Sequence, residues 1–516
     1  MQRREFFRLV GGSAAAVLGA SAGMGALSLA GCGADGATPS PSANGDPDAD
    51  LVADDPSLPD HVVGQPAQVS FRTTADVLVV GSGIAGLSAA LVAAKAGLSV
   101  ILAEKQDMLG GDSVNAMGLM HVAGTSVQKA AGIAVDDAAR AEAWKSREEQ
   151  LKAAGVADLD FARKLYEAAT DWVNLVADEC GSQFADPSSY DEQGMGRRLL
   201  LPKLGLGDMA DVMSPIRDRL TALKVQTLAS CRAEALIVDG SGSVCGVRFL
   251  YVKSGDVEDI GAKRVVVATG GFSSSQPLIH QHASSYERLG SYSTASMGQG
   301  QQLCAAYGAA LAGMQDAVGL LGDVPVVNAW GAFGPVLVVD ALGRRMAAED
   351  VPAAAAEACF TGGLGYWWTV YDGALMQGSQ GRSVAETTAK NKQRLVGPCD
   401  TVADLAQAMG LAESALDDAF QQMKTAASAG KDAAFGRKLY LQELAGPFYA
   451  FKQLPLRART RGGVKTDDQG RAVGSVGAAL GNLYVCGSAA QGGGDLASNG
   501  AFGMLVGQAI ADELVG

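Results

Sequence analysis

The chain has 516 residues, 48% of which are hydrophobic, and a formal net charge of −14. This length is enough for two or three domains with a large apolar core. The acidic balance, with no basic run against it, argues against a protein that binds nucleic acid or anionic lipid surfaces.

The first 31 residues are typical of an export signal. Arg3 and Arg4 precede a mildly apolar segment rich in Gly, Ala and Ser, which ends in the sequence L-A-G-C at Cys32. This order favours a twin-arginine lipoprotein signal, with Cys32 as the lipidated first residue of the mature chain. A transmembrane anchor over residues 9–31 is the alternative, but the Gly and Ser content makes that segment poorly hydrophobic. We therefore expect an exported protein, anchored by lipid to the outer face of the cytoplasmic membrane.

An acidic segment follows the signal. Residues 33–70 contain seven Asp, six Pro and no Lys or Arg. Such a composition buries too little apolar surface to order itself, so residues 32–70 are predicted to be a disordered tether.

The strongest motif begins the globular part of the chain. An apolar run over residues 77–80 is followed by Gly81, Gly83 and Gly86, then by a helical pattern, and a second apolar run ends at Glu104. This is the order of a strand, a phosphate-binding turn, a helix and a second strand that ends in an acid. The first glycine permits the turn, the second lets a pyrophosphate approach the backbone, and the third permits close packing of helix and strand. The sequence therefore predicts a dinucleotide site, with Glu104 accepting the ribose hydroxyls.

The eight cysteines are scattered singly along the chain. They form no C-x-x-C, no haem-attachment sequence and no iron–sulfur spacing. We predict mostly buried thiols and no metal site, although one disulfide is compatible with the sequence.

Several later segments extend the first motif. They are the glycine pair of L-G-G-D-S-V-N-A-M-G at 109–118, a hairpin pattern at 231–250, the V-V-V-A-T-G-G-F run at 265–272, R-A-R-T-R-G-G at 457–463, and Y-V-C-G at 484–487. In this order and spacing they resemble the FAD-dependent fumarate reductase/succinate dehydrogenase flavoprotein superfamily. That superfamily also includes urocanate reductase, aspartate oxidase and 3-ketosteroid dehydrogenase.

The resemblance implies an α/β fold, with a Rossmann-like FAD-binding domain and an inserted α+β capping domain. Residues 71–313 and 447–516 would form the FAD-binding domain, and residues 314–446 the cap over the substrate. The family positions that would contact FAD fall on the following residues: Gly81, Gly83, Ala85, Gly86, Glu104, Lys105, Gly110, Gly111, Asp112, Ser113, Gly118, Ala235, Ala268, Thr269, Gly270, Gly487 and Ala501.

The chain departs from the family where a dicarboxylate would bind. No histidine follows His282, and no Lys or Arg follows Arg471, so the two histidines and the C-terminal arginine of fumarate-type members are missing. The cap arginine that would deliver a proton is also absent from its usual place. Because a small dianion would lose its charged partners, we expect an uncharged or bulky organic substrate.

Three side chains are candidates for catalysis. Arg459 stands by resemblance where the second family histidine would lie, and could stabilise an anion; the alternative is an extended strand with arginines paired to surface acids. Asp495 precedes the last helix, where an N-cap role is at least as plausible. Tyr449 could donate a proton but could equally be a core residue. His121 follows the second glycine pair, and a lone histidine is more often structural.

We predict from these observations an FAD-dependent oxidoreductase that reduces an activated C=C bond. Because no haem or iron–sulfur motif is present, electrons would come from a separate membrane donor, either a cytochrome or a quinol-linked protein. Two alternatives stay open: a dehydrogenase or oxidase acting in the opposite direction, and a flavin-binding protein without catalysis.

Overall fold

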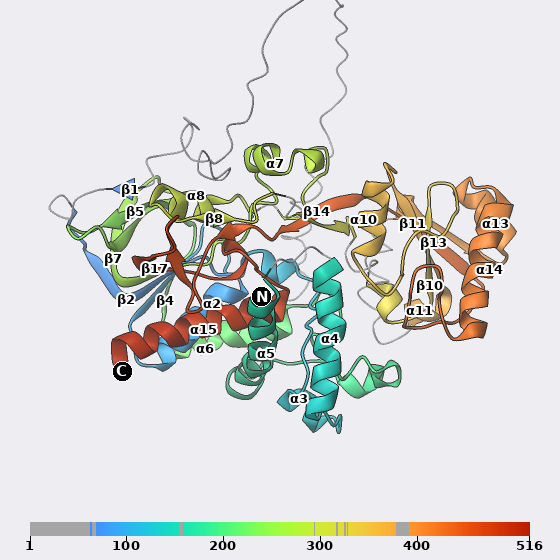
Figure 1. The fold of residues 1–516 in the computed structure, drawn as a ribbon, viewed down its shortest axis with the longest axis horizontal. Helices are drawn as coiled ribbons and strands as arrows, with labels where there is room; N and C mark the ends of the chain where they lie inside the picture. Colours follow the sequence, from blue (N-terminus) through green and yellow to red (C-terminus); the bar gives the residue numbers. More distant parts are fainter. Residues whose placement is uncertain are drawn as a thin grey trace, which may run out of the picture. The chain divides into compact units, whose positions relative to one another are not determined.

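The computed structural model describes residues 62–63, 69–153, 158–293, 295–315, 318–324, 327, 329–377 and 392–516 (Figure 1). The predicted signal, Cys32 and most of the predicted tether lie outside the described residues. Among the residues that are described, no helix is both long enough and apolar enough to cross a membrane.

A large mixed sheet forms the centre of the first domain. Parallel pairing joins β7 to β2, β2 to β3 and β3 to β4, and β17 also runs parallel to β7, whereas β5, β6 and β7 pair antiparallel. Its described strands, in spatial order, are β1 (Val62–Val63), β5 (Cys231–Val238), β6 (Val244–Tyr251), β7 (Val257–Val267), β2 (Thr73–Val80), β3 (Val100–Ala103) and β4 (Gln226–Leu228), with β17 (Ala479–Val485) on β7 and β16 (Arg471–Val473) on β17. The β5–β6 pairing confirms the hairpin expected from residues 231–250.

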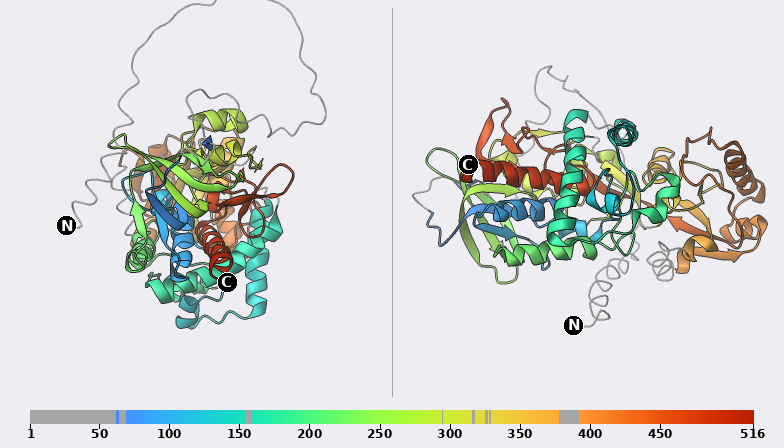
Figure 2. Two further views of the ribbon diagram at one scale, coloured as in Figure 1. Left: turned by 90° about the vertical axis from the view of Figure 1, so that its left-hand side faces the viewer. Right: turned by 90° about the horizontal axis from the view of Figure 1, so that it is seen from below.

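The helices of this domain are α2 (Ile84–Lys95), α3 (Ser126–Ala130), α4 (Asp137–Ala153), α5 (Leu159–Asn174), α6 (Ala210–Ala222), α7 (Gln276–His282), α8 (Gln299–Ala306) and α15 (Leu496–Val515). Helices α2 and α8 contact strands of the sheet, α6 and α15 pack on α2, and α5 packs on α15. Figures 1 and 2 show α15 lying along α2. The two helices can approach closely because Gly503 has no side chain: a Cβ there would lie 2.0 Å from the carbonyl oxygen of Ala85.

Helix α5 packs against α15 and α4 in the first domain. Trp172 on α5 is fully buried, and its indole N–H donates to Ser88 Oγ on α2 at 2.8 Å. Gly500 on α15 leaves room for this ring, since a Cβ would lie 2.3 Å from it. Trp172 therefore connects three helices, α2, α5 and α15, beneath the glycine turn at Gly81–Gly86.

The cap is built on a four-stranded antiparallel sheet. The strands, in spatial order, are β10 (Val336–Asp340), β11 (Trp367–Asp372), β13 (Phe448–Gln453) and β12 (Leu395–Cys399). Its helices are α10 (Ala354–Thr361), α11 (Gly373–Gln377), α13 (Val402–Met409) and α14 (Glu413–Ala429). Val339 and Val370 of this sheet pack in one core with Leu405 of α13 and Leu416 of α14.

The return from the cap occurs later than the predicted residue 447. β13 pairs along its whole length with β11, and Phe448 and Ala450 belong to the cap core. The chain leaves through β14 (Pro455–Thr460), which pairs with β9 (Val318–Gly322), while β8 (Leu311–Ala312) pairs with β15 (Gly463–Val464). The predicted boundary at residue 447 falls just before β13, because this strand carries no sequence signal for which sheet it joins.

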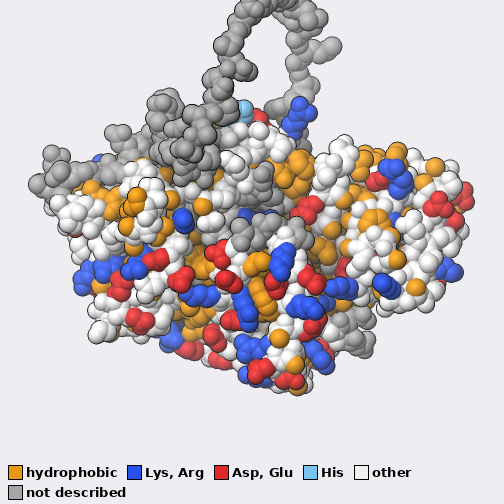
Figure 3. All heavy atoms as spheres, viewed as in Figure 1, with side chains coloured by type: hydrophobic (Ala, Val, Ile, Leu, Met, Phe, Trp, Pro, Cys, Tyr) orange, Lys and Arg blue, Asp and Glu red, His pale blue; other side chains and the backbone are white. Residues whose placement is uncertain are grey.

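Charges are mixed on the surface. On the face shown in Figure 3, basic and acidic side chains are interspersed rather than separated.

Candidate active site

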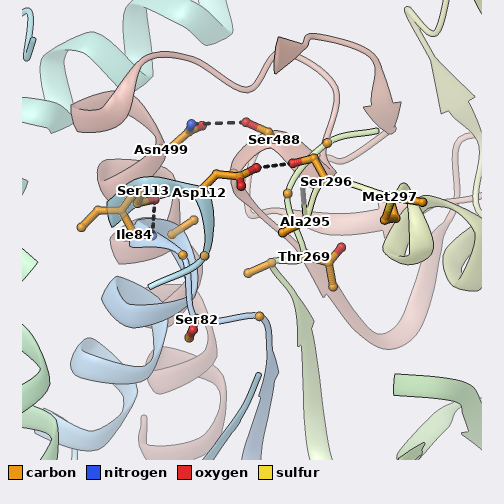
Figure 4. Close-up of a pocket in the computed structure, with 18 of the residues that line it drawn as sticks. Ser82, Ile84, Asp112, Ser113, Thr269, Ala295, Ser296, Met297, Ser488 and Asn499 are labelled. Atoms are coloured by element: carbon orange, nitrogen blue, oxygen red, sulfur yellow. Dashed lines mark hydrogen bonds between the residues drawn. The ribbon is translucent and has the colours of Figure 1, made fainter. Parts of the chain in front are cut away.

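One elongated cavity lies at the carboxyl ends of β2, β3 and β7, where an open α/β sheet usually binds its ligand. Figure 4 shows part of its wall. At one end it is lined by Glu104 and by the start of β5, and at the other by Arg459, Asp495, Leu496 and Asn499. We call these the Glu104 end and the Arg459 end.

The glycine turn after β2 forms the middle of the cavity. Gly81 has φ +102°, and a Cβ there would lie 2.4 Å from the carbonyl oxygen of Ala268. A Cβ on Gly86 would lie 1.9 Å from the carbonyl oxygen of Gly81. At Gly83, the N-cap residue of α2, the nearest atom would be Ser113 Oγ at 3.6 Å. The first and third glycines are therefore required by packing, and the second leaves open space at a helix N-terminus, as a pyrophosphate needs.

The carboxylate of Glu104 is held at its end of the cavity. Oε2 accepts hydrogen bonds from the N–H (3.0 Å) and hydroxyl (2.6 Å) of Ser82, and Oε1 accepts one from the N–H of Gln106 (2.9 Å). The side chain is only 5% exposed and still lines the cavity. Since a carboxylate offers about four acceptor positions, acceptor capacity is left for ribose hydroxyls.

The second glycine pair carries polar groups to the same cavity. Ser113 Oγ accepts from the N–H of Ile84 at 3.0 Å, which leaves its own hydroxyl hydrogen free to donate (Figure 4). Asp112 accepts a hydrogen bond from Ser296. Thr269 Oγ1 and Ser273 Oγ are buried beside the cavity and have no hydrogen-bond partner among the described residues. Unpaired buried hydroxyls at a cavity wall fit a polar ligand.

The Arg459 end is strongly charged. Asp495 is the N-cap residue of α15, where Oδ1 accepts from the N–H of Ser498 at 3.0 Å. Its other oxygen, Oδ2, lies 3.1 Å from His121 Nδ1 and 3.0 Å from Arg147 Nη2. Although burial opposes ionisation, Arg147 and His121 hold the pKa of Asp495 far below its usual range. The residue is a fixed anion and cannot serve as an acid near neutral pH.

Arg459 lies at the end of β14 and faces the cavity. Its Nη1 donates a hydrogen bond to the carbonyl oxygen of Gly494 at 3.5 Å, and its side chain is part of the cavity lining. Burial, together with the neighbouring charges of Arg461 and Arg147, lowers its pKa to about 10. Arg457, two residues earlier, is directed to Gln276 Oε1 (3.1 Å) outside the cavity lining. A register shift in the β14–β9 pair separates the two arginines, and within the described chain neither forms an ion pair with a surface acid.

A family model described as "FAD binding domain" matches residues 76–501. The chain belongs to this family. FAD is therefore its cofactor, and the protein is an FAD-dependent oxidoreductase.

The chain is similar to several proteins named as reductases. Probable fumarate reductase Ifc3 of Shewanella frigidimarina is 26% identical over 451 residues, spanning 86% of this chain and 73% of that protein. Digoxin reductase of Eggerthella lenta is 26% identical over 557 aligned positions, spanning 94% of this chain and 91% of that protein. Among solved structures, the open conformation of a flavocytochrome c3 fumarate reductase aligns with a TM-score of 0.64 and 25% identity, over 86% of this chain and 79% of the other.

Most of the residues predicted to contact FAD meet at the cavity. The lining includes Gly81, Gly83, Ala85, Glu104, Lys105, Gly111, Asp112, Ser113, Ala268, Thr269, Gly270 and Gly487. Lys105 is tied down there by hydrogen bonds from Nζ to the carbonyl of Ala295 and to Gln299 Oε1. Burial lowers its pKa.

Five predicted FAD contacts fall outside the described lining: Gly86, Gly110, Gly118, Ala235 and Ala501. Gly86 and Gly110 permit close packing behind the wall, and Gly118 packs under Pro202, where a Cβ would lie 2.6 Å from the ring. Ala235 is 2% exposed, and a register shift between it and Ala233 brings Ala233 to the cavity instead. Ala501 is fully buried inside α15.

Tyr449 does not fit the role of proton donor. It lies on β13 in the cap and stacks on Tyr371 with ring centres 5.7 Å apart, and it is not among the described residues of the cavity lining. The structure therefore does not bring Tyr449 together with Arg459 and Asp495, because β13 pairs within the four-stranded sheet.

Arg147 and His121 at the Arg459 end were not identified as a pair from the sequence. Arg147 lies within a helix rich in charged residues, where nothing marks it out from its neighbours. Because of Arg459 and of Arg147 beside Asp495, this end of the cavity is less neutral than the missing family residues led us to expect.

Proposed function

We propose that this protein reduces an activated C=C bond of an organic substrate with electrons supplied by a separate donor. The observation that carries the proposal is the arrangement of one continuous cavity, with Glu104 at one end, the glycine turn in the middle, and buried Arg459 beside the N-terminus of α15 at the other end. When bound and reduced by the donor, the cofactor would supply a hydride to the substrate.

The chain's own residues hold the cofactor and stabilise charge. The glycine turn and Ser113 would hold the pyrophosphate, and Glu104 the ribose. The redox-active ring would then lie toward the Arg459 end. Arg459 and the partial positive charge of the α15 N-terminus would stabilise negative charge on the reduced cofactor or on a substrate oxygen.

We further propose a substrate that is bulkier than fumarate and carries a carbonyl group conjugated with the alkene. The loss of the family's dicarboxylate residues supports the larger size, as does the similarity to digoxin reductase over nearly the whole length of both chains. Arg459 supports a polar oxygen next to the alkene, because a guanidinium stabilises the enolate that develops there.

A panel of alkenes tests this function. Purified holoprotein, kept reduced by an excess of a reduced viologen dye under anaerobic conditions, would be offered 2-cyclohexenone, cinnamate and a 4-ene-3-ketosteroid. We expect dye oxidation with at least one of them, together with its saturated product. Reduction of the flavin by a saturated ketone, with no turnover of any alkene, would instead indicate the dehydrogenase direction. A folded protein that contains no flavin and does not take it up would indicate a binding protein.

Arg459→Met is expected to lower the two-electron midpoint potential of the bound flavin. Losing one charge-assisted interaction of about 1.5–3 kcal/mol corresponds to a fall of about 30–65 mV. Arg457→Met is the matched control, since that arginine lies on the same strand but outside the described cavity lining. The measurement is a spectroscopic redox titration against reference dyes. Equal shifts in the two variants would contradict the role of Arg459.

We also propose that the enzyme is exported and lipid-anchored at Cys32, and that its donor is a membrane cytochrome or a quinol-linked protein. The twin arginines, the L-A-G-C sequence and the acidic segment that follows them support this. Metabolic labelling with a fatty acid should mark the wild-type chain and leave Cys32→Ser unmarked.

A further inference from the structure

His121 is directed away from the protein core. Its neighbours Met120 and Val122 are fully buried, and both pair with the segment 198–200 through backbone hydrogen bonds: Met120 with Leu200, and the N–H of Val122 with the carbonyl of Arg198. In an extended chain successive side chains point to opposite sides, so His121 projects to the side away from these two core residues.

Asp495 fixes the orientation of the imidazole. His121 Nδ1 lies 3.1 Å from Asp495 Oδ2; Asp495 lines the cavity at the Arg459 end, and His121 stands directly beside it, one contact beyond the described lining. Since the carboxylate accepts, Nδ1 carries a hydrogen and Nε2 is the nitrogen left for another partner. Within the described residues no hydrogen bond is found for Nε2, and 28% of the His121 side chain is exposed.

The charges around the imidazole come from several elements. Arg147 on α4 shares Asp495 Oδ2 with His121, and Arg198 faces the pair from the neighbouring segment. Burial and then Arg147 lower the pKa of His121, whereas Asp495 raises it. Tyr166 on α5 has a buried hydroxyl with no hydrogen-bond partner among the described residues. Burial, and then the negative charge of Asp495, raise the pKa of Tyr166 to about 12.

We propose that His121 is the catalytic acid–base residue that exchanges a proton with the substrate, and that Asp495 and Arg147 are its positioning residues. The assignment rests on the proposed function. In the reducing direction the π bond of the alkene breaks and two C–H bonds form. One carbon receives the hydride that bound FAD supplies, and the other receives the proton from His121 Nε2. The substrate gains two electrons, the separate donor restores them to the cofactor, and solvent reprotonates His121.

Other side chains near the cavity are less suited to this step. Asp495 stays ionised, and Arg459, with a pKa of about 10, stays charged near neutral pH. Tyr449 lies in the cap sheet, and Tyr166 has a hydroxyl that is hard to ionise. A histidine held by a carboxylate is the usual arrangement for proton transfer in this pH range.

The first test follows the titration of His121 directly. The chain has four histidines, so its imidazole signals can be assigned by nuclear magnetic resonance of the holoprotein, using His121→Gln to identify the signal that disappears. Asp495→Asn keeps a residue that caps a helix well, and should lower the pKa of His121. Arg147→Gln should raise it. A pKa that responds to neither change would overturn the assigned arrangement.

The second test measures proton transfer. Protein reduced with dithionite is mixed anaerobically with an alkene from the panel, and flavin reoxidation is followed across about pH 5–8. In wild type the rate should fall as pH rises through the pKa of His121, because the protonated form is the donor. His121→Gln should lose this pH dependence and about 10²–10⁴-fold in rate, with flavin content unchanged.

His280→Gln is the matched control, because His280 forms the same kind of contact, 3.0 Å from Glu287, on exposed α7. It should behave as wild type. If His121→Gln keeps the wild-type rate and pH profile, the assignment fails while the proposed function stands. If wild type itself transfers no hydride to any alkene, the proposed function fails and the role of His121 fails with it.

Discussion

Gly81→Ala is expected to produce a chain that no longer retains FAD. A Cβ at this position would lie 2.4 Å from the carbonyl oxygen of Ala268 and 2.8 Å from its carbonyl carbon, so two backbone segments must move apart. The residue also has φ +102°, which costs a non-glycine residue about 1–3 kcal/mol. Overpacking adds about 1–3 kcal/mol, and both penalties act on the turn that would hold the pyrophosphate.

Gly97→Ala separates these two penalties. Gly97 also has a positive φ, +86°, but a Cβ there would meet no atom within 4 Å. This variant should lose some stability and keep its flavin. The measurement is the ratio of flavin to protein absorbance after purification and after incubation with added FAD. A yellow Gly81→Ala protein with wild-type flavin content would contradict our account of the turn.

Arg345→Met is expected to lower the free energy of unfolding of the cap more than almost any other single substitution in it. Its guanidinium is fully buried between two acids: Nη2 lies 2.7 Å from Glu349 Oε2 and 2.7 Å from Asp432 Oδ2. Arg437 lies 3.4 Å from the same Glu349 oxygen. Removing one member of a buried ion pair leaves uncompensated charge, which costs about 3–5 kcal/mol.

The neighbouring Arg344 provides the control. Its side chain is 64% exposed and pairs with Asp340, so Arg344→Met should cost less than about 1 kcal/mol. Denaturant unfolding followed by tryptophan fluorescence suits this test, because Trp330, Trp367 and Trp368 all lie in the cap. Equal midpoints for the two variants would show that the buried network contributes little.

The part of the site that could be predicted from the sequence is local. The turn around Gly81, the acid at the end of β3 and the second glycine pair each follow directly from a strand, so their spacing along the chain determines their place in space. The β5–β6 hairpin is local in the same sense. Within it the sequence misjudged only Ala235, because a register shift inside a strand leaves no mark on hydrophobic alternation.

The reactive end of the cavity could not be predicted in this way. Arg147 and His121 meet Asp495 across 348 and 374 residues of chain, and no periodicity records such a contact. Asp495 looked equally like a helix cap or a catalytic residue, and the structure gives it the cap together with contacts to Arg147 and His121. The strand that carries Tyr449 pairs with β11 rather than within the large sheet, and the sequence does not show this because a strand's partners depend on tertiary packing.

The most direct measurement of the central claim is a single turnover. Holoprotein reduced with one equivalent of dithionite is mixed, without oxygen, with the alkene that is turned over best in the panel. The account predicts complete return of the oxidised flavin spectrum and one saturated product molecule per flavin. A flavin that stays reduced in the presence of every alkene, in protein that is folded and fully loaded, would contradict it.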